Sequence, residues 1–165
     1  GLRCIIWGRH VPYKRFDIAV EACSRLGIEL DVLGSGPDTE RLKKLAGQTV
    51  TFHGRVSDEE VSRLASEAHV FLSPQEEDFG IAPVEALAAG LPIIAYKAGG
   101  ALDYVIPGKT GMCFDEQTVD SLCAALKAFR PVDFDPEYIS RYAHEMFDNA
   151  VFSRSLKEFI EAHQA

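Results

Sequence analysis

Two glutamates and a glycine in residues 76–85 have the types and spacing to bind a sugar phosphate. Glu77 comes just before a predicted helix and Glu85 lies inside it, with Gly80 at the helix start. Free backbone N–H groups at a helix start can meet an anion, and glycine lets a ligand come close to the main chain. Sugar hydroxyls can donate hydrogen bonds to the carboxylates. The alternative is an acidic first turn in which Glu77 and Asp78 stabilise the helix dipole.

A basic loop follows the first predicted strand. Gly8 ends that strand, and Arg9 and Lys14 lie in the loop that leads to the first helix. The planar guanidinium of arginine and the mobile ammonium of lysine can both bind phosphate oxygens. This pair would suit a diphosphate leaving group, whose negative charge grows as its bond breaks. The alternative is a solvated basic turn, and we prefer that interpretation for Arg15.

Two glycine turns follow the second and third predicted strands. The turn at residues 34–38 contains Gly36 and resembles a nucleotide-binding loop, although any sharp strand-to-helix turn would also suit this sequence. The turn of Gly54, Arg55 and Val56 lies at the same predicted sheet edge, where its backbone could present hydrogen-bonding groups to a nucleobase.

Short β-rich runs alternate with amphipathic segments along the chain. This alternation predicts an α/β fold: a Rossmann-like, doubly wound, mostly parallel six-stranded sheet with helices on both faces and ligands at the carboxyl ends of the strands. Two extra helices at the C-terminal end should lie across one end of the sheet. The strands are expected near 3–8, 29–34, 50–54, 69–73, 92–96 and 111–114, and the helices near 15–26, 38–47, 58–68, 81–89, 101–106, 117–129, 136–147 and 151–163.

Length and composition limit the domain count and the partners. The chain has 165 residues, of which 47% are hydrophobic, so we expect one domain over 1–165. A formal net charge of -8 argues against nucleic acid as a partner. The four cysteines lack metal or redox spacings, so we expect buried thiols in a reducing, cytoplasmic compartment. Because a strand begins almost at Gly1, we also expect a piece of a longer protein.

Taken together, these motifs in this order resemble one known family. The chain looks like the C-terminal, donor-binding domain of the glycosyl transferases group 1, retaining enzymes with two Rossmann-like domains that face across a cleft. The resemblance covers nearly the full length. It is carried most specifically by the pair of glutamates, by Phe79 and Gly80, and by the segments at residues 90–95 and 108–111.

The resemblance implies roles for individual residues. Arg9 and Lys14 would hold the donor diphosphate beside Gly8 and take the place of a catalytic metal, so that no metal or other cofactor is expected. Glu77 would accept hydrogen bonds from the transferred sugar, and Glu85 would hold the ribose hydroxyls. The remaining donor-binding positions by this resemblance are Gly36, Gly54, Arg55, Val56, Phe79, Gly80 and Ile81.

The resemblance also implies a reaction and a missing part. The acceptor hydroxyl would attack on the face from which the nucleotide diphosphate departs, with retention of anomeric configuration. An N-terminal acceptor-binding domain would be absent, so this chain alone should be inactive as a transferase. The acceptor would be a glycan or a lipid-linked sugar, with peripheral association at the inner membrane face through the missing domain.

The motif variants look most like those of mannosyltransferases of polysaccharide assembly, which suggests GDP-mannose as the donor. Two alternatives stay open. One is an enzyme resembling nucleotide-sugar epimerases, and the other is a non-catalytic nucleotide-sugar-binding module.

For His10, we prefer a surface histidine beside the loop to a phosphate neighbour.

Overall fold

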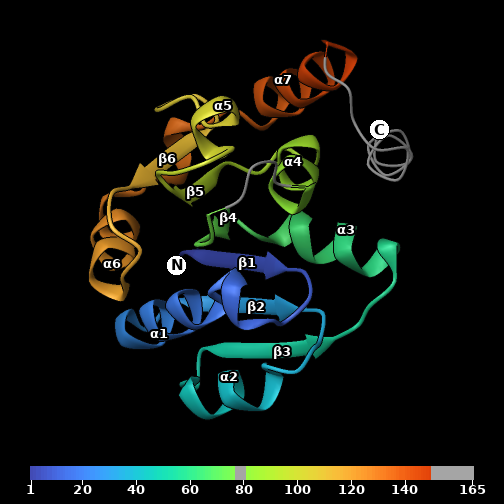
Figure 1. Cartoon of the computed structure of the whole chain (residues 1–165). Coiled ribbons are helices and arrows are strands. Elements are labelled where there is room, and N and C mark those ends of the chain that lie inside the picture. Colours follow the sequence, from blue (N-terminus) through green and yellow to red (C-terminus); the bar gives the residue numbers. More distant parts are fainter. Residues whose placement is uncertain (77–80, 150–165) are drawn as a thin grey trace.

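A single parallel sheet forms the centre of the molecule (Figure 1). The structure, a computed structural model, describes residues 1–76 and 81–149, with side chains up to residue 146. Six strands lie in the order β3-β2-β1-β4-β5-β6, and every pairing is parallel. They are β1 (Arg3–Trp7), β2 (Glu29–Leu33), β3 (Val50–Gly54), β4 (Val70–Ser73), β5 (Ile93–Tyr96) and β6 (Gly111–Phe114).

Helices cover both faces of this sheet, as the sequence predicted. One core lies between the sheet and α1, α2 and α6, and a second lies between the sheet and α3, α4, α5 and α7. The doubly wound, Rossmann-like prediction is therefore confirmed. The helices are α1 (Phe16–Leu26), α2 (Thr39–Leu45), α3 (Asp58–Glu67), α4 (Ile81–Ala88), α5 (Ala101–Tyr104), α6 (Val119–Ala128) and α7 (Pro136–Asn149), with short 3-10 turns η1 (Pro12–Lys14) and η2 (Pro131–Asp133).

Helix α5 is shorter than predicted. We expected a helix over 101–106, but it ends at Tyr104 and Val105 is already extended. Pro107 disfavours helical geometry at Ile106, and the Thr110 hydroxyl binds the helix end, because it accepts from the Ile106 N–H at 2.7 Å and donates to the Tyr104 carbonyl at 2.9 Å. The predicted helix over 151–163 lies outside the described residues.

Helix α7 packs against α4. Its buried residues Ile139 and Ala143 belong to the same core as the α4 side chains, and the Ser140 hydroxyl donates to the carbonyl of Ala88 at 2.9 Å. A Cβ added at Gly90 would lie 3.1 Å from the carbonyl oxygen of Pro136, so the turn after α4 lies close to the first turn of α7.

The cysteines are all free thiols. Cys4, Cys23 and Cys123 are buried, as we expected, whereas Cys113 on the edge strand β6 is only half-buried. The expectation of four buried thiols was therefore wrong for Cys113, because an edge strand has a neighbour on one side alone.

Candidate functional site

The first cavity of the candidate site lies where β1, β2 and β3 end. It has a volume of about 330 Å³ and is lined by Gly8, Arg9, Gly34, Ser35 and Arg55. These residues come from three loops that are far apart in sequence but share the carboxyl edge of the sheet. The structure thus brings Gly8, Arg9 and Arg55 together, at the edge where ligands bind in open α/β sheets.

An apolar cavity of about 200 Å³ adjoins the first one. The two cavities share Gly8, Gly34 and Arg55, and the remaining lining residues of the second are Trp7, Leu33, Val56 and Val61. One end of the combined site is therefore cationic and the other is a hydrophobic wall.

The loops after β1 and β2 pack backbone against backbone at very short distances. A Cβ added at Gly34 would lie 2.1 Å from the carbonyl oxygen of Gly8, and one at Gly36 would lie 2.4 Å from that of His10. The His10 N–H donates to Ser35 O at 3.0 Å, and the Asp38 N–H donates to His10 O at 2.9 Å. Both glycines are thus required for the approach of two loops, and Gly36 does not line either cavity of the site.

His10 is buried, so our expectation of a surface histidine was wrong. The side chain is 1% exposed and packs beside Phe16, with 5.1 Å between ring centroids. Its Nδ1 lies 2.8 Å from the Thr39 hydroxyl and its Nε2 lies 3.1 Å from Leu33 O. The Gly36 N–H donates to the same hydroxyl at 3.0 Å, so a hydrogen-bonded chain holds the ring.

Burial lowers the pKa of His10, against the opposing effect of the Leu33 carbonyl. A neutral ring fits this environment, with the Thr39 hydroxyl donating to Nδ1 and the Nε2 hydrogen donated to Leu33. His10 therefore joins the two loops instead of facing the cavity.

Three cations at this edge carry no ion pair with any described residue: Arg9, Lys14 and Arg55. Lys14 is half-buried, and its Nζ would lie 3.5 Å from a Cβ at Gly8. Arg15 differs, because its guanidinium pairs with Asp17 at 3.2 Å. The site is thus locally basic in a chain whose formal net charge is -8.

Glu85 is half-buried on α4. Burial raises its pKa to about 7, the Trp7 indole acts against this rise as a hydrogen-bond donor, and the charge of Asp58 adds to it. Trp7 Nε1 is itself buried and has no hydrogen bond of regular geometry among the described residues. Near neutral pH the carboxyl therefore changes easily between its protonated and ionised forms.

Part of the predicted site falls outside the described residues, namely Glu77, Phe79 and Gly80. Ile81 is the first residue of α4 and is 48% exposed. Gly54 ends β3 with a φ of 70°, and its backbone carbonyl accepts from the Gly34 N–H at 2.8 Å.

Three lining residues were missed from the sequence: Trp7, Leu33 and Val61. Gly34 and Ser35 belong to the predicted turn at residues 34–38. Trp7 also packs edge-on against Phe71, with ring centroids 4.6 Å apart. Position in the sequence could have identified Trp7 and Leu33 as lining residues, because they lie where β1 and β2 end.

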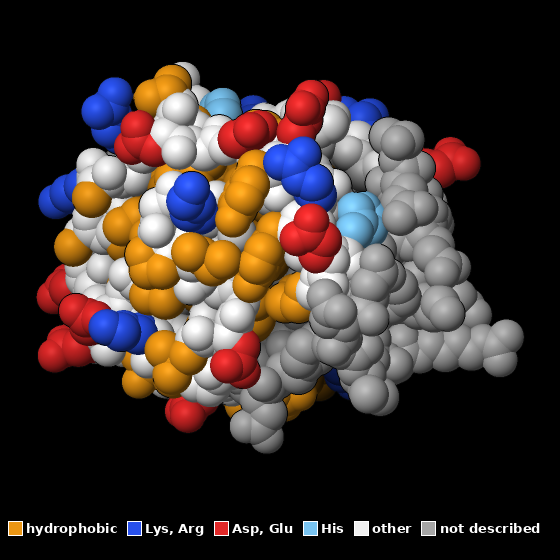
Figure 2. Space-filling model, turned by 90° about the horizontal axis from the view of Figure 1, so that it is seen from above, with side chains coloured by type: hydrophobic (Ala, Val, Ile, Leu, Met, Phe, Trp, Pro, Cys, Tyr) orange, Lys and Arg blue, Asp and Glu red, His pale blue; other side chains and the backbone are white. Residues whose placement is uncertain are grey.

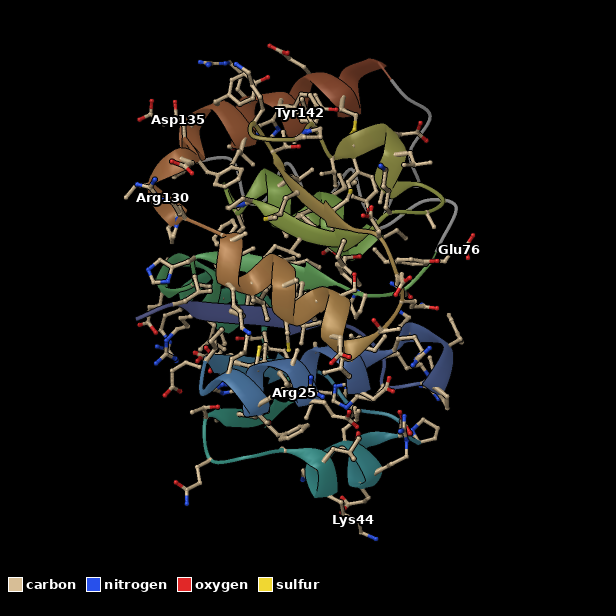
Figure 3. The ribbon with its side chains drawn as sticks, turned by 90° about the vertical axis from the view of Figure 1, so that its left-hand side faces the viewer. Arg25, Lys44, Glu76, Arg130, Asp135 and Tyr142 are labelled. Atoms are coloured by element: carbon tan, nitrogen blue, oxygen red, sulfur yellow. The ribbon has the colours of Figure 1, made fainter. Side chains whose placement is uncertain are left out.

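Metal ligation has no support in the part of the chain that the structure describes, where no group of three or more His, Cys, Asp or Glu side chains could hold an ion. The sequence does contain one Asp-x-Asp triplet, Asp133-Phe134-Asp135. It lies at η2, and Figure 3 shows Asp135 on the side of the molecule opposite Glu76, which follows β4. This triplet is therefore remote from the candidate site, and the expectation of metal-free chemistry stays a prediction.

A larger cavity, of about 390 Å³, lies beside α5 and the edge strand β6. Figure 2 shows hydrophobic side chains gathered on this face of the molecule, with charged groups among them. Leu102, Val105, Pro107 and Met112 line the cavity, and none of the predicted site residues does.

The parallel sheet with helices on both faces is that of a Rossmann-like domain, and a glycine-lined, cationic cavity lies at its carboxyl edge. The family model of the glycosyl transferases group 1 matches residues 3–146. The chain therefore belongs to this family, as the motifs suggested.

A curated relative gives the same assignment. The chain is 36% identical over 136 residues to a GDP-mannose-dependent alpha-(1-6)-phosphatidylinositol monomannoside mannosyltransferase of Mycobacterium tuberculosis. The alignment covers 72% of this chain and 35% of that protein. The chain thus spans about a third of the relative's length.

Solved structures share the fold. TarM of S. aureus, in a complex that includes UDP, superposes with a TM-score of 0.74 at 16% identity, covering 98% of this chain and 35% of TarM. HepE of Anabaena, in complex with UDP and glucose, superposes with a TM-score of 0.73 at 19% identity, covering 98% and 47% of the two chains.

Proposed function

We propose that this chain binds a nucleotide diphosphate sugar as the donor domain of a retaining glycosyltransferase. Its contribution to the reaction is to hold the donor and to stabilise the diphosphate as it leaves. Family membership and the names of relatives support this class of donor.

The observation that carries the proposal is the cationic cavity at the carboxyl edge of an acidic protein. Arg9 and Arg55 line it and have no ion-pair partner among the described residues, while Lys14 lies against the Gly8 turn beside it. A diphosphate supplies the missing negative charge, and arginine forks bind its oxygens in pairs. Because these cations are already in place, they would stabilise the transition state most as the departing diphosphate becomes more negative.

The adjoining apolar cavity suits the nucleoside. Val56 and Val61 offer it a hydrophobic wall, and the Gly54–Val56 turn lies at its border. Glu85 on α4 would accept hydrogen bonds from the ribose hydroxyls in its ionised form. Glu77, outside the described residues, would accept hydrogen bonds from the transferred sugar.

GDP-mannose is the donor that we favour, because the motif variants resemble those of mannosyltransferases and the Mycobacterium tuberculosis relative is GDP-mannose-dependent by name. UDP-sugars are the second choice, because HepE is described in complex with UDP and glucose. The acceptor would be a glycan or a lipid-linked sugar.

The remaining part of the enzyme would be an N-terminal acceptor-binding domain, and without it we expect no transfer. The protein would act at the cytoplasmic side, with any membrane contact made through that other domain. Among residues 1–76 and 81–149, no helix is long and apolar enough to cross a bilayer.

Calorimetric titration of the chain with GDP, UDP, ADP and GDP-mannose, without metal, tests the proposal. Arg9→Ala and Lys14→Ala should each weaken binding by about 10- to 100-fold, since each removes a hydrogen-bonded charge. Arg130→Ala is the matched control, because Arg130 is exposed and lies opposite Glu76 in Figure 3. It should leave binding unchanged.

Equal affinity in the Arg9 and Lys14 variants would refute the diphosphate site. It would favour the epimerase-like enzyme if a nucleotide sugar still binds and is isomerised. Tight binding of a nucleotide sugar with no transfer, even when the acceptor domain is supplied, would favour the non-catalytic module.

A further inference from the structure

A small cavity of about 10 Å³ lies between the loop after β1, the end of β4 and the start of α4. Most of its lining is apolar, and the polar side chains that reach it are Trp7, Lys14, Ser73 and Gln75. A volume of this size holds about one water molecule, provided that polar groups are present to bind it.

Gln75 presents an unexplained polar atom in this cavity. The side chain is 9% exposed, and its Oε1 is buried with no hydrogen-bond partner in the described part of the chain. Buried polar atoms are almost always paired, so an orphan acceptor indicates a donor that is still to be identified.

Three lining side chains could supply that donor. The Trp7 indole is a neutral donor whose buried Nε1 has no hydrogen bond of regular geometry among the described residues, and it lowers the pKa of Glu85, which does not line this cavity. Ser73 offers a single hydroxyl. Lys14 offers an ammonium group that donates only, carries no ion pair with a described residue and lies next to Gly8.

Charge separates Lys14 from the two neutral donors, Trp7 and Ser73. A hydrogen bond between an ammonium group and an amide oxygen is charge-assisted and stronger than one from a neutral hydroxyl.

We propose that Gln75 is a positioning residue that holds Lys14 through one buried water, which accepts from the lysine ammonium and donates to Gln75 Oε1. The inference rests on the proposed function, in which Lys14 binds the donor diphosphate. Gln75 itself touches no nucleotide. Its effect is to fix the ammonium over the Gly8 turn before the donor arrives, so that less side-chain freedom is lost on binding.

Hydrogen exchange of the Lys14 ammonium, followed by NMR in the unliganded chain, tests the contact without any nucleotide. Lys14→Met identifies the signal. Exchange should become several-fold faster in Gln75→Leu, which keeps the volume but removes the acceptor, and should stay slow in Gln75→Glu, which keeps an acceptor. Ser73→Ala is the control and should leave the rate unchanged. Equal rates in wild type and Gln75→Leu, or faster exchange only in Ser73→Ala, would overturn the proposal.

Nucleotide titration then tests the consequence for the site. Gln75→Leu should weaken GDP or UDP binding by about three- to tenfold, and this loss should vanish when Lys14 is already alanine. A loss of the same size in the Lys14→Ala background would show a general structural effect and refute the positioning role. If wild type binds no nucleotide, the proposed function fails, while the exchange measurement still decides the Gln75–Lys14 contact.

Discussion

Replacing Glu85 by glutamine should stabilise the protein, by an amount that depends on pH. Burial raises the pKa of this carboxyl from 4.5 to about 7, a difference equivalent to about 3 kcal/mol between its two protonation states. Below about pH 4.5 the group is protonated in both the folded and the unfolded chain and contributes nothing to the pH dependence. Between about pH 4.5 and 7 the unfolded chain loses this proton while the folded chain keeps it, so the free energy of unfolding falls as pH rises.

Above about pH 7 the folded protein carries the full penalty of an ionised, half-buried carboxylate. Glutamine has the same shape, stays neutral and can still accept from the Trp7 indole, so Glu85→Gln should be more stable than wild type by about 3 kcal/mol at about pH 8. The two proteins should become similar towards about pH 4.5. Groups that titrate in both proteins cancel in this difference.

Urea unfolding at a series of pH values measures the difference. Circular dichroism is the better probe, because the chain has one tryptophan, Trp7, whose fluorescence would respond directly to the Glu85 charge. Glu29→Gln, at an exposed strand position, is the matched control and should show no such pH-dependent gain. The reasoning is refuted if the stability difference between wild type and Glu85→Gln is the same at about pH 5 and about pH 8.

Three further predictions concern stability and can be checked by urea unfolding at neutral pH. Asp31→Asn should destabilise the protein by about 1–3 kcal/mol, because this buried carboxylate accepts from Arg3 at 3.1 Å and pairs with His53 at 2.8 Å. Asp120→Asn, which removes an exposed ion pair, should have a much smaller effect. Equal losses of stability would contradict the role of burial. Gly34→Ala should lower the free energy of unfolding by more than about 2 kcal/mol, since the φ of Gly34 is 96° and the new Cβ would lie 2.1 Å from a carbonyl oxygen. Gly108→Ala, with a φ of 78° but open space around the new Cβ, should lower it by about 1 kcal/mol. Similar losses in the two variants would mean that the loops can move apart at little cost in stability. Thr39→Val should cost about 1–3 kcal/mol because it leaves a backbone N–H and a buried imidazole without their shared hydroxyl, and an unchanged midpoint would argue against the hydrogen-bonded chain.

The fold followed from the sequence because its signals were local and repeated. Each apolar strand run and each amphipathic helix could be recognised alone, and parallel sheets bury strands so fully that β4 is apolar until its last residue. The short α5 was overestimated because its apolar pattern continues to Ile106, whereas Pro107 restricts Ile106 and the Thr110 hydroxyl binds the Tyr104 carbonyl at the helix end.

The site was predicted less completely, because it depends on contacts between loops. Arg9 and Arg55 could be placed at one sheet edge from strand order, and they do line one cavity. The burial of His10 could not be foreseen, since it requires the partner hydroxyl of Thr39, which is 29 residues away in sequence. The orphan oxygen of Gln75 is likewise visible only when the packing around it is known.

The interlocked loops after β1 and β2 have a consequence for protein engineering. Gly34 and Gly36 leave no room for a side chain against the backbone of Gly8 and His10. A chimera that imports one of these loops from a relative would therefore join surfaces that were not shaped for each other, even if each loop is compatible with its own strand and helix. Recombination of substrate preference within the family should succeed more often when residues 8–15 and 34–39 are exchanged as one unit.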